Sequence, residues 1–409
     1  MKLSTTWAAL AIILFSGAAQ AQLTAAGTRN LKTRYLVAFK QGAASSDKSA
    51  TLEQMGLSAI EQIDELGAVV VEGQAGKFQA SAAAGLASDP NVAWVEQDQY
   101  WPNMLVDMAP ASFAQLPLPA LQEIMAQLPK VMPSQTDGEL PWGIRRVNAP
   151  AAWPATQGEG VRVAVVDTGI DFKHPDLAPN YAGGYNAIDS SKTPMDDNGH
   201  GTHVAGTIAA VKDGKGVAGV APKARLYAVK VLDKDGGGGL VSIIKGLIWC
   251  GRNHIQVANM SLGAPISTPF MHWAVMYAAA KGVTIVAAAG NSGGSVSYPG
   301  AYSETIAVSA ADARDKIAEW SSRGKEVAFI APGVDVLSDW PGGGLETESG
   351  TSMATPHMTG LAALAVSQGA STPAQVRKAL EAAAVKVDGL SATEQGHGMV
   401  DAAKLIKKK

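Results

Sequence analysis

From Pro141 onward, short apolar runs alternate with longer segments of helical composition, and this alternation limits the possible folds more than any other feature of the sequence. Strands that alternate with helices pair in parallel, and the helices then cover both faces of the sheet. We therefore expect an α/β fold of three layers, in which a doubly wound, mostly parallel sheet lies between helices. Strands are predicted at Val161–Val166, Arg225–Leu232, Val257–Met260, Val283–Ala288, Thr305–Ala310 and Val327–Ile330.

The first 21 residues have the pattern of a secretory signal peptide. Met1-Lys2 is cationic, Trp7–Phe15 is apolar, and Ala19 and Ala21 are small residues at the two positions that a signal peptidase reads. The apolar run is too short to span a bilayer as a stable helix, which argues against the alternative of a membrane anchor. We expect cleavage after Ala21 and a secreted product, extracellular or periplasmic, that no longer contacts a membrane.

Three further segments follow the signal peptide. Residues 22–100 combine strands and helices into a small α+β module of the split βαβ, ferredoxin-like type. Residues 101–136 are rich in proline and are expected to form a linker, with a candidate helix at 118–128. Residues 137–409 carry the alternating pattern. In the α+β module, strands are predicted at Arg34–Phe39, Gly67–Val71 and Val92–Val95, and helices at Ser45–Met55 and Phe78–Ala87.

Charge and cysteine content exclude several classes of protein. The chain has 33 Lys and Arg against 36 Asp and Glu, a net charge of −3, so nothing indicates a nucleic-acid partner. Cys250 is the only cysteine, which excludes an intrachain disulfide and a multi-cysteine metal site, and we expect it to be a small buried residue. An exported protein without disulfides needs another source of stability, and bound calcium is one candidate.

Four polar side chains stand where the predicted strands and helices meet. Asp167 follows the first strand of the large sheet, and Asn291 follows the strand that ends at Ala288. His200 begins a helix rich in small residues, and Ser352 stands at the start of another helix, with a proline in its first turn. Each residue has a purely structural alternative, as a capping Asp, a turn Asn, a buried core His or a helix-capping Ser.

One mechanism unites these four residues. A serine hydroxyl becomes a good nucleophile when a histidine takes its proton and a carboxylate orients that histidine. The amide of Asn291 and the backbone N–H of Ser352 would then stabilise the oxyanion. A competing interpretation is a metal pair of His200 with His203, but no glutamate follows, as zinc-hydrolase motifs require.

These residues lie in motifs that resemble the subtilisin-like serine protease family. The motifs are Val-Val-Asp-Thr-Gly, His-Gly-Thr-His-Val-Ala-Gly and Gly-Thr-Ser-Met-Ala-Thr-Pro-His, and the resemblance runs from about Pro141 to Leu405. It implies that Asp167 orients the catalytic His200, that Ser352 attacks, and that Asn291 completes the oxyanion hole. It also implies a serine endopeptidase that acts on proteins and peptides through an acyl-enzyme, with no organic cofactor, and we expect a monomer.

Residues 34–98 resemble the inhibitory propeptide of the same family. This module is a template for folding and an intramolecular inhibitor, which the enzyme removes by its own cleavage. The chain differs from the family pattern because residues 101–136 intervene before the catalytic domain. We therefore expect the cut either near Leu105 or nearer to Ser134–Glu139.

The resemblance implies that a peptide substrate binds as an added strand between two exposed edges. A loose loop is the alternative interpretation of the glycine run in the first edge. No acidic cluster lies in these segments, which favours broad cleavage after apolar side chains over a dibasic specificity. The edges match Gly236, Gly237 and Gly238 on one side and Ser261, Leu262 and Gly263 on the other, and the pocket is expected between Ala288, Ala289 and Gly290, with Ser297 near its base.

The resemblance also implies a structural calcium ion. Asp176, in His-Pro-Asp-Leu, matches a ligand of the family, and the segment 211–217 matches the ligand loop in length. Asp213 would supply a side-chain oxygen, and Val211, Lys215 and Val217 would supply backbone carbonyls. Two lysines in the loop oppose this interpretation, and a loop without metal is the alternative.

Two other functions compete with that of a self-processed secreted endopeptidase. A catalytically silent binding or chaperone-like protein with the same fold is possible in principle, but no motif residue is missing. An esterase of the α/β-hydrolase type is excluded because the segment from Gly350 to Ala354 lacks the Gly-x-Ser-x-Gly turn.

Overall fold

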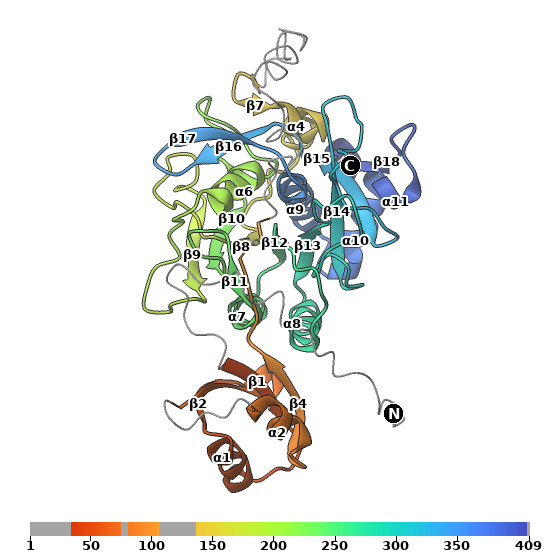
Figure 1. Ribbon diagram of the computed structural model, residues 1–409. Coiled ribbons are helices and arrows are strands. Elements are labelled where there is room, and N and C mark those ends of the chain that lie inside the picture. The colour runs from red at the N-terminus through yellow and green to blue at the C-terminus, as the bar shows by residue number, and fades with distance from the viewer. Residues whose placement is uncertain (1–33, 75–80, 103, 106–135, 407–409) are drawn as a thin grey trace, which may run out of the picture.

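A seven-stranded sheet forms the centre of the larger part of the molecule (Figure 1). The computed structural model describes residues 34–74, 81–102, 104–105 and 136–406. All neighbouring strands of this sheet run parallel, which confirms the predicted doubly wound α/β fold. The sheet order is β15 (Val327–Pro332), β14 (Thr305–Ala311), β13 (Thr284–Ala288), β12 (Val257–Met260), β8 (Arg162–Asp167), β10 (Arg225–Lys230) and β9 (Tyr181–Asn186).

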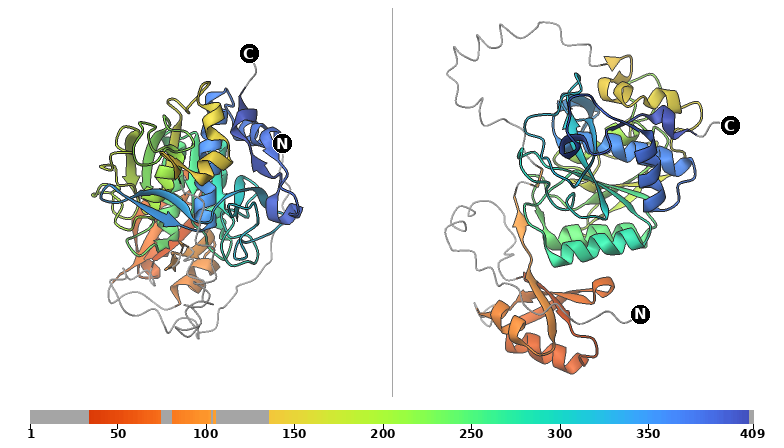
Figure 2. Two further views of the ribbon diagram at one scale, coloured as in Figure 1. Left: turned by 90° about the horizontal axis from the view of Figure 1, so that it is seen from above. Right: turned by 90° about the vertical axis from the view of Figure 1, so that its right-hand side faces the viewer.

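Helices cover both faces of this sheet because alternate strand residues point to opposite sides. In β8, Val163 and Val165 pack in the core formed with α6 (His200–Ala209), α9 (Thr351–Ser367) and α10 (Pro373–Ala383). Ala164 and Val166 pack instead in the core formed with α7 (Leu240–Arg252) and α8 (Pro269–Ala280). Figure 2 shows these layers from two further sides.

The order of strands places a crevice at the end of β8. The chain runs from β8 to β9 and β10 on one side and then to β12 on the other. Ligands of such sheets bind at this reversal, beyond the carboxyl ends of the strands. Asp167, the last residue of β8, therefore lies at the expected position of a functional site.

In the larger part of the molecule, two longer strand regions were not predicted. Edge strand β9 has the sequence YAGGYN, whose two glycines conceal the strand pattern. The antiparallel hairpin of β16 (Val336–Trp340) and β17 (Gly344–Glu348) lies just before α9. Its sequence has only a weak strand pattern, and the tertiary contacts described below hold the hairpin in place.

The N-terminal module is a four-stranded antiparallel sheet with two helices. Its sheet order is β2-β3-β1-β4, so the predicted three strands are joined by β2, which the sequence analysis had missed. Within the described residues, the second helix begins at Ala82. Residues 78–80, the first turn of the predicted helix, lie outside the described residues. The elements are β1 (Arg34–Phe39), α1 (Ser45–Gln54), β2 (Leu57–Ile63), η2 (Asp64–Leu66), β3 (Ala68–Gly73), α2 (Ala82–Ser88) and β4 (Val92–Gln97).

This module packs with one sheet face on α7 and α8, as Figure 1 shows. Tyr35 and Val37 of β1 face the helices of the module itself. Leu36 and Ala38 share a core with α7 and α8. Successive residues of β1 therefore pack alternately into two separate cores.

Short elements complete the described chain. Among the described residues, no helix combines the length and the apolar character that a bilayer span requires. The predicted signal peptide at 1–21 and the candidate helix at 118–128 lie outside the described residues. The short elements are β5 (Tyr100–Trp101), β6 (Thr136–Asp137), β7 (Leu140–Pro141), α4 (Trp142–Arg146), α5 (Ala149–Ala152), β11 (Gly238–Gly239), β18 (Ala384–Val385), α11 (Ala392–Gln395), β19 (Met399–Val400) and η3 (Ala402–Leu405).

Candidate active site

The end of β8 and the start of α6 bring an aspartate and a histidine together. The Nδ1 atom of His200 lies 2.8 Å from Oδ1 of Asp167. Asp167 is fully buried, and the backbone N–H of Thr168 donates to the same oxygen at 2.7 Å. A carboxylate that binds Nδ1 leaves Nε2 as the nitrogen that can accept a proton from a substrate or nucleophile.

The surroundings of His200 favour its protonated form. Burial lowers the pKa of the imidazole, but the charge and hydrogen bond of Asp167 raise it, with smaller contributions from Asp196 and Glu348. The net effect places the pKa above its ordinary value of 6.5. Such a group can act as a base near neutral pH and can hold the proton that it takes up.

His203 has a different environment from His200. Its Nε2 atom donates to the carbonyl of Val336 at 2.9 Å, which anchors the β16–β17 hairpin on α6. Burial, and then the charge of His200, lower its pKa to about 3. The two rings therefore have separate partners, and this arrangement does not support the metal-pair interpretation.

Ser352 is the second residue of α9 and contacts Ser261, which follows β12. Its hydroxyl donates to the backbone carbonyl of Ser261 at 3.1 Å. Pro356 was expected in the first turn, but it is the sixth residue of the helix. Proline has no N–H for the carbonyl four residues earlier, which here is Ser352 O. The hydroxyl of Ser261 donates to that carbonyl at 2.7 Å and replaces the missing bond.

The side-chain amide of Asn291 has a fixed orientation. Its Oδ1 atom accepts hydrogen bonds from both N and Oγ1 of Thr351, each at 2.8 Å. A backbone N–H can only donate, so this side of the amide must be the oxygen. A side-chain carbon placed on Gly350 would lie 3.4 Å from Nδ2 of Asn291 and 3.5 Å from N of Ser352. These two N–H groups therefore border the same small space.

The tail of the N-terminal module lies between the two predicted substrate edges. Trp101 pairs with Gly238 in a short antiparallel sheet, and N of Leu105 lies 3.4 Å from the carbonyl of Gly236. On the other side, the N–H of Gly263 donates to the carbonyl of Met104 at 3.1 Å. Backbone pairing of this kind accepts an extended chain largely irrespective of its side chains.

The predicted pocket walls lie together in the structure. Ala288 and Ala289 are buried, and the carbonyl of Ala289 accepts a hydrogen bond from the N–H of Ser297 at 2.8 Å. A side-chain carbon on Gly290 would lie 2.5 Å from the hydroxyl of Ser297, and one on Gly263 would lie 3.0 Å from Cβ of Ser297. Ser297 therefore joins the second substrate edge to the pocket wall, and only glycine fits at these two positions without rearrangement.

The predicted calcium loop closes over Asp176. The N–H of Val217 donates to Oδ2 of Asp176 at 3.2 Å, and Gly216 leaves room for this carboxylate because any side-chain carbon there would overlap it. Asp213 is exposed, and its Oδ1 atom accepts the N–H of Lys215 at 3.0 Å. The side chain of Glu139 accepts hydrogen bonds from the backbone N–H groups of Asp213 and Gly214. The carboxylate of Asp176 thus lies against the loop, whereas that of Asp213 faces its own backbone.

Two residues with structural roles at the site, Lys230 and Met104, were not singled out from the sequence, and a third, Ser261, was given a different role. Lys230 ends β10, and its buried ammonium donates to the carbonyl of Thr168, beside Asp167, at 2.5 Å. Ser261 supports Ser352 through its hydroxyl, whereas the sequence analysis assigned it only a substrate edge. Met104 is fully buried between the edges. The one available signal was a lysine at the end of an otherwise buried strand.

Comparison with known proteins identifies two regions of this chain. A family model described as the subtilase family matches residues 158–398, and a model described as the fervidolysin N-terminal prodomain matches residues 18–98. Subtilisin Savinase from Lederbergia lenta is 47% identical over 266 residues, which cover 64% of this chain and 97% of that protein. Subtilisin E from Bacillus subtilis (strain 168) is 38% identical over 387 residues, which cover 92% and 91% of the two chains. An alkaline protease from Shouchella clausii is 44% identical over 305 residues, which cover 74% and 78%.

Proposed function

Because this chain belongs to the subtilase family and is a serine-type endopeptidase with an N-terminal prodomain, we propose that Asp167, His200 and Ser352 are its catalytic triad. The hydrogen bond of 2.8 Å between His200 and buried Asp167 carries this proposal. In the reaction, the hydroxyl of Ser352 leaves the carbonyl of Ser261, gives its proton to Nε2 of His200 and attacks the scissile carbonyl. His200 then donates that proton to the leaving amine, and Asp167 stabilises the imidazolium.

The oxyanion of the tetrahedral intermediate is assigned to Asn291 and to the backbone N–H of Ser352. Both N–H groups border the space beside Gly350, and Thr351 holds the amide in the required orientation. Ser352 also lies at the N-terminus of α9, where the helix dipole favours negative charge. Donors fixed in advance lower the barrier because they need no reorganisation during the reaction.

We assign residues 22–100 to the inhibitory prodomain and the first self-cleavage to the chain just beyond Leu105. The segment Tyr100–Leu105 already occupies the edges that a substrate would pair with, in the antiparallel direction. Met104 binds the N–H of Gly263, two residues from Ser261, whose carbonyl accepts the hydroxyl of Ser352. Residues 101–136 would then remain in large part as an N-terminal extension of the catalytic domain, which we assign to 137–409.

The substrates proposed for the mature enzyme are extended segments of proteins and peptides. Gly236–Gly238 and Ser261–Gly263 would pair with the backbone, and the pocket beside Ala288–Gly290 would take an apolar side chain before the scissile bond. We further propose secretion after removal of residues 1–21, and one structural calcium ion held by Asp176, Asp213 and the carbonyls of Val211, Lys215 and Val217. The contact of the loop with Asp176 supports the calcium assignment.

Self-processing of the expressed chain tests the proposal directly. The wild-type chain should convert to a shorter form, and N-terminal sequencing should place the first cut within a few residues after Leu105. The Ser352→Ala chain should keep its prodomain, with the parental fold by circular dichroism. A serine-directed phosphonylating reagent should modify Ser352 alone. A processed Ser352→Ala chain, or modification at another serine with loss of activity, would contradict the assignment.

A further inference from the structure

A second group of possible metal ligands lies on the other side of Asp176 from the loop. His174, Asp176 and Asp339 are 2%, 5% and 0% exposed, and each offers a ligand atom within 4.8 Å of the other two. His174 and Asp176 belong to the turns that follow β8, and Asp339 belongs to β16. The fold therefore brings together two segments that are more than a hundred residues apart in the sequence.

Asp339 is the feature of this group that needs an explanation. Both of its carboxylate oxygens are buried and, within the described residues, accept no backbone or side-chain N–H; the side-chain partner of Asp339 is the carboxyl group of Asp176. A buried carboxylate beside another carboxylate is unfavourable unless a proton or a cation lies between them.

His174 has an unprotonated Nδ1 atom with one lone pair, which accepts the N–H of Asp176 and which a metal ion would take over. Its Nε2 atom lies 3.0 Å from the carbonyl of Gly344, which can only accept, so Nε2 carries the hydrogen. The unprotonated Nδ1 accepts the N–H of Asp176 at a long 3.2 Å and lies 3.8 Å from Oδ1 of Asp339. Two ligands at about 2.1 Å from one metal ion lie about 3–4 Å apart. A histidine whose second nitrogen binds a backbone carbonyl is also the usual arrangement of a metal ligand.

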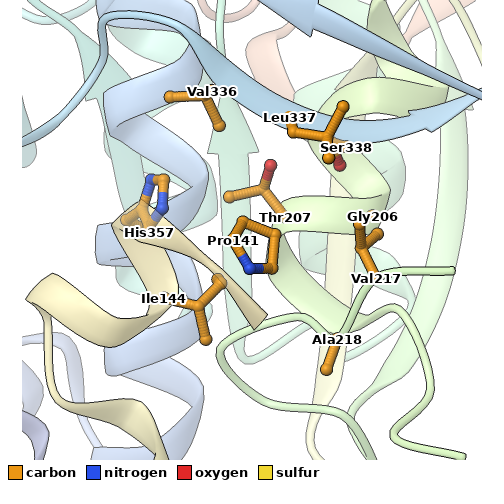
Figure 3. A pocket seen from close by; sticks show the side chains of 10 residues that line it. All are labelled: Pro141, Ile144, Gly206, Thr207, Val217, Ala218, Val336, Leu337, Ser338 and His357. Carbon is orange, nitrogen blue, oxygen red and sulfur yellow. The ribbon is translucent and has the colours of Figure 1, made fainter. Parts of the chain in front are cut away.

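Glycine residues of the surrounding backbone lie against both carboxylates, where no other residue would fit. A side-chain carbon on Gly206 would lie 2.7 Å from Oδ2 of Asp339, and one on Gly216 would overlap Asp176. Figure 3 shows the neighbouring pocket, which is lined by Ser338 of β16, Gly206 of α6 and Val217 of the loop. Glycine on both sides permits a close approach to oxygens that side chains would otherwise cover.

We propose that His174, Asp176 and Asp339 bind one divalent transition-metal cation of the zinc or manganese class. One imidazole nitrogen and two carboxylates form a donor set that these metals favour, and the two carboxylates balance the charge of the ion. The site shares only Asp176 with the proposed calcium loop, whose ligands would all be oxygens. The ion would tie the β16–β17 hairpin to the turns after β8, in addition to the bond from the N–H of Gly342 to Asp171 at 2.9 Å.

Metal binding to the full-length Ser352→Ala chain tests this proposal without self-cleavage. After chelation and dialysis, the chain is titrated separately with Co²⁺, Zn²⁺ and Mn²⁺, and bound metal, visible absorption of cobalt and thermal unfolding are measured. We expect about one equivalent of metal, a cobalt spectrum with nitrogen and oxygen ligands, and a higher Tm. Asp339→Asn and His174→Gln should each weaken binding at least about 10-fold, since loss of an outer-shell partner alone costs that much.

Two controls separate this site from a folding defect and from the calcium loop. Asp213→Asn changes the loop carboxylate and should leave cobalt binding unchanged. In chelator, Asp339→Asn should unfold at a Tm no lower than its parent, because an amide can donate a hydrogen bond to Asp176 without taking up a proton. Three results would overturn the proposal: no transition metal bound and no change in Tm, as a shared proton would give; cobalt binding that survives both Asp339→Asn and His174→Gln; or binding of calcium alone, dependent on Asp213.

Discussion

The carbonyl group of Ser352 lies at a point where its own helix cannot provide a hydrogen bond. Pro356 removes the donor, and the hydroxyl of Ser261 replaces it. Ser261 in turn accepts from Asn259 at 2.9 Å, and Asn259 accepts from Thr359 at 2.8 Å. This buried chain of hydrogen bonds fixes the backbone of Ser352, the proposed nucleophile, against β12, and its partial loss is unfavourable because every member is shielded from water.

Removal of the Ser261 hydroxyl should therefore destabilise the protein in a way that a second substitution repairs. In the Ser352→Ala background, Ser261→Ala leaves a buried carbonyl without its hydroxyl partner and should lower the free energy of unfolding by about 1–3 kcal/mol. Pro356→Ala added to Ser261→Ala restores a helical N–H to that carbonyl and should recover part of the loss. Urea unfolding of the four chains of this double-mutant cycle measures the coupling. Strictly additive effects would contradict the role given to Ser261.

The pH dependence of activity should follow the raised pKa of His200. The neutral imidazole is the base, so kcat/KM should rise as His200 loses its proton, with a midpoint above its ordinary pKa of 6.5. Asp167→Asn removes the charge that raises this pKa, so the midpoint should move to lower pH while the rate falls by about 10⁴-fold. Peptide hydrolysis between about pH 5 and 9 measures both effects. A profile that is flat over this range would refute the assignment of His200 as the base.

At the scale of whole elements, the prodomain binds the N-termini of two helices. The carboxylate of Asp98 accepts the N–H of Val241 at 3.0 Å, in the first turn of α7. The carboxylate of Glu96 accepts the N–H of Phe270 at 3.3 Å, in the first turn of α8. These N–H groups have no partner within their own helices, so prodomain binding satisfies them. The salt bridge of 2.9 Å between Glu61 and Lys245 lies nearer the rim.

Prodomain affinity should fall as pH rises toward neutrality. Burial raises the pKa of bound Glu96 from 4.5 to about 7, although its hydrogen bonds to Phe270 and Thr268 oppose this. The free prodomain exposes Glu96, so binding takes up a proton between these two values, and affinity decreases with pH across that range. The raised pKa of Asp98 acts in the same direction. Glu96→Gln should therefore reduce the difference in affinity between about pH 5 and pH 8.

Inhibition of the mature enzyme by its separated prodomain measures this effect. Glu61→Gln is the matched control, since it changes the charge of the interface at the rim and should leave the pH dependence of Glu96 in place. Equal pH dependence in the Glu96→Gln and wild-type prodomains would show that another group takes up the proton.

At the scale of the whole molecule, most contacts join distant parts of the chain. The parallel sheet needs long crossovers, and such topologies fold slowly because distant segments must meet before any contact forms. The prodomain sheet covers α7 and α8, and its tail pairs with β11 beyond the sheet. One module thus contacts both the helical layer and the predicted substrate edges. Both contacts are expected of a prodomain that is a template for folding and also blocks the proposed active site.

Calcium should stabilise the whole catalytic domain through its loop. For the Ser352→Ala chain, calcium at about 100 times its Kd should add about 2.7 kcal/mol to the free energy of unfolding, and chelation should lower the Tm by several degrees. Asp213→Asn should reduce the gain on adding calcium back. Asp388→Asn, which changes an exposed carboxylate elsewhere, should not. An unchanged response in Asp213→Asn would remove the loop from the proposed calcium site.

Patterns that are local in the sequence predicted much of this protein correctly. The six apolar strands of the large sheet, the helices that begin at His200 and before Ser352, and the family were all predicted from contiguous residues. Strand β9 was missed because its glycines carry no β-branched pattern, and β16 because Ser338 and Asp339 interrupt its apolar run. The position of Pro356 was misjudged because α9 begins one residue before Ser352.

The amino-acid sequence by itself determined the periodicity of the elements and the family, and it supplied the candidate catalytic side chains, since all three depend on neighbouring residues. Only the tertiary structure decided that residues 100–102 and 104–105 lie between the predicted substrate edges, that Ser261 supports Ser352, and that Asp339 meets His174 and Asp176. The physical reason is that hydrogen bonding and charge pairing act over a few ångströms in space. Folding, and not spacing along the chain, determines which distant residues come within that distance.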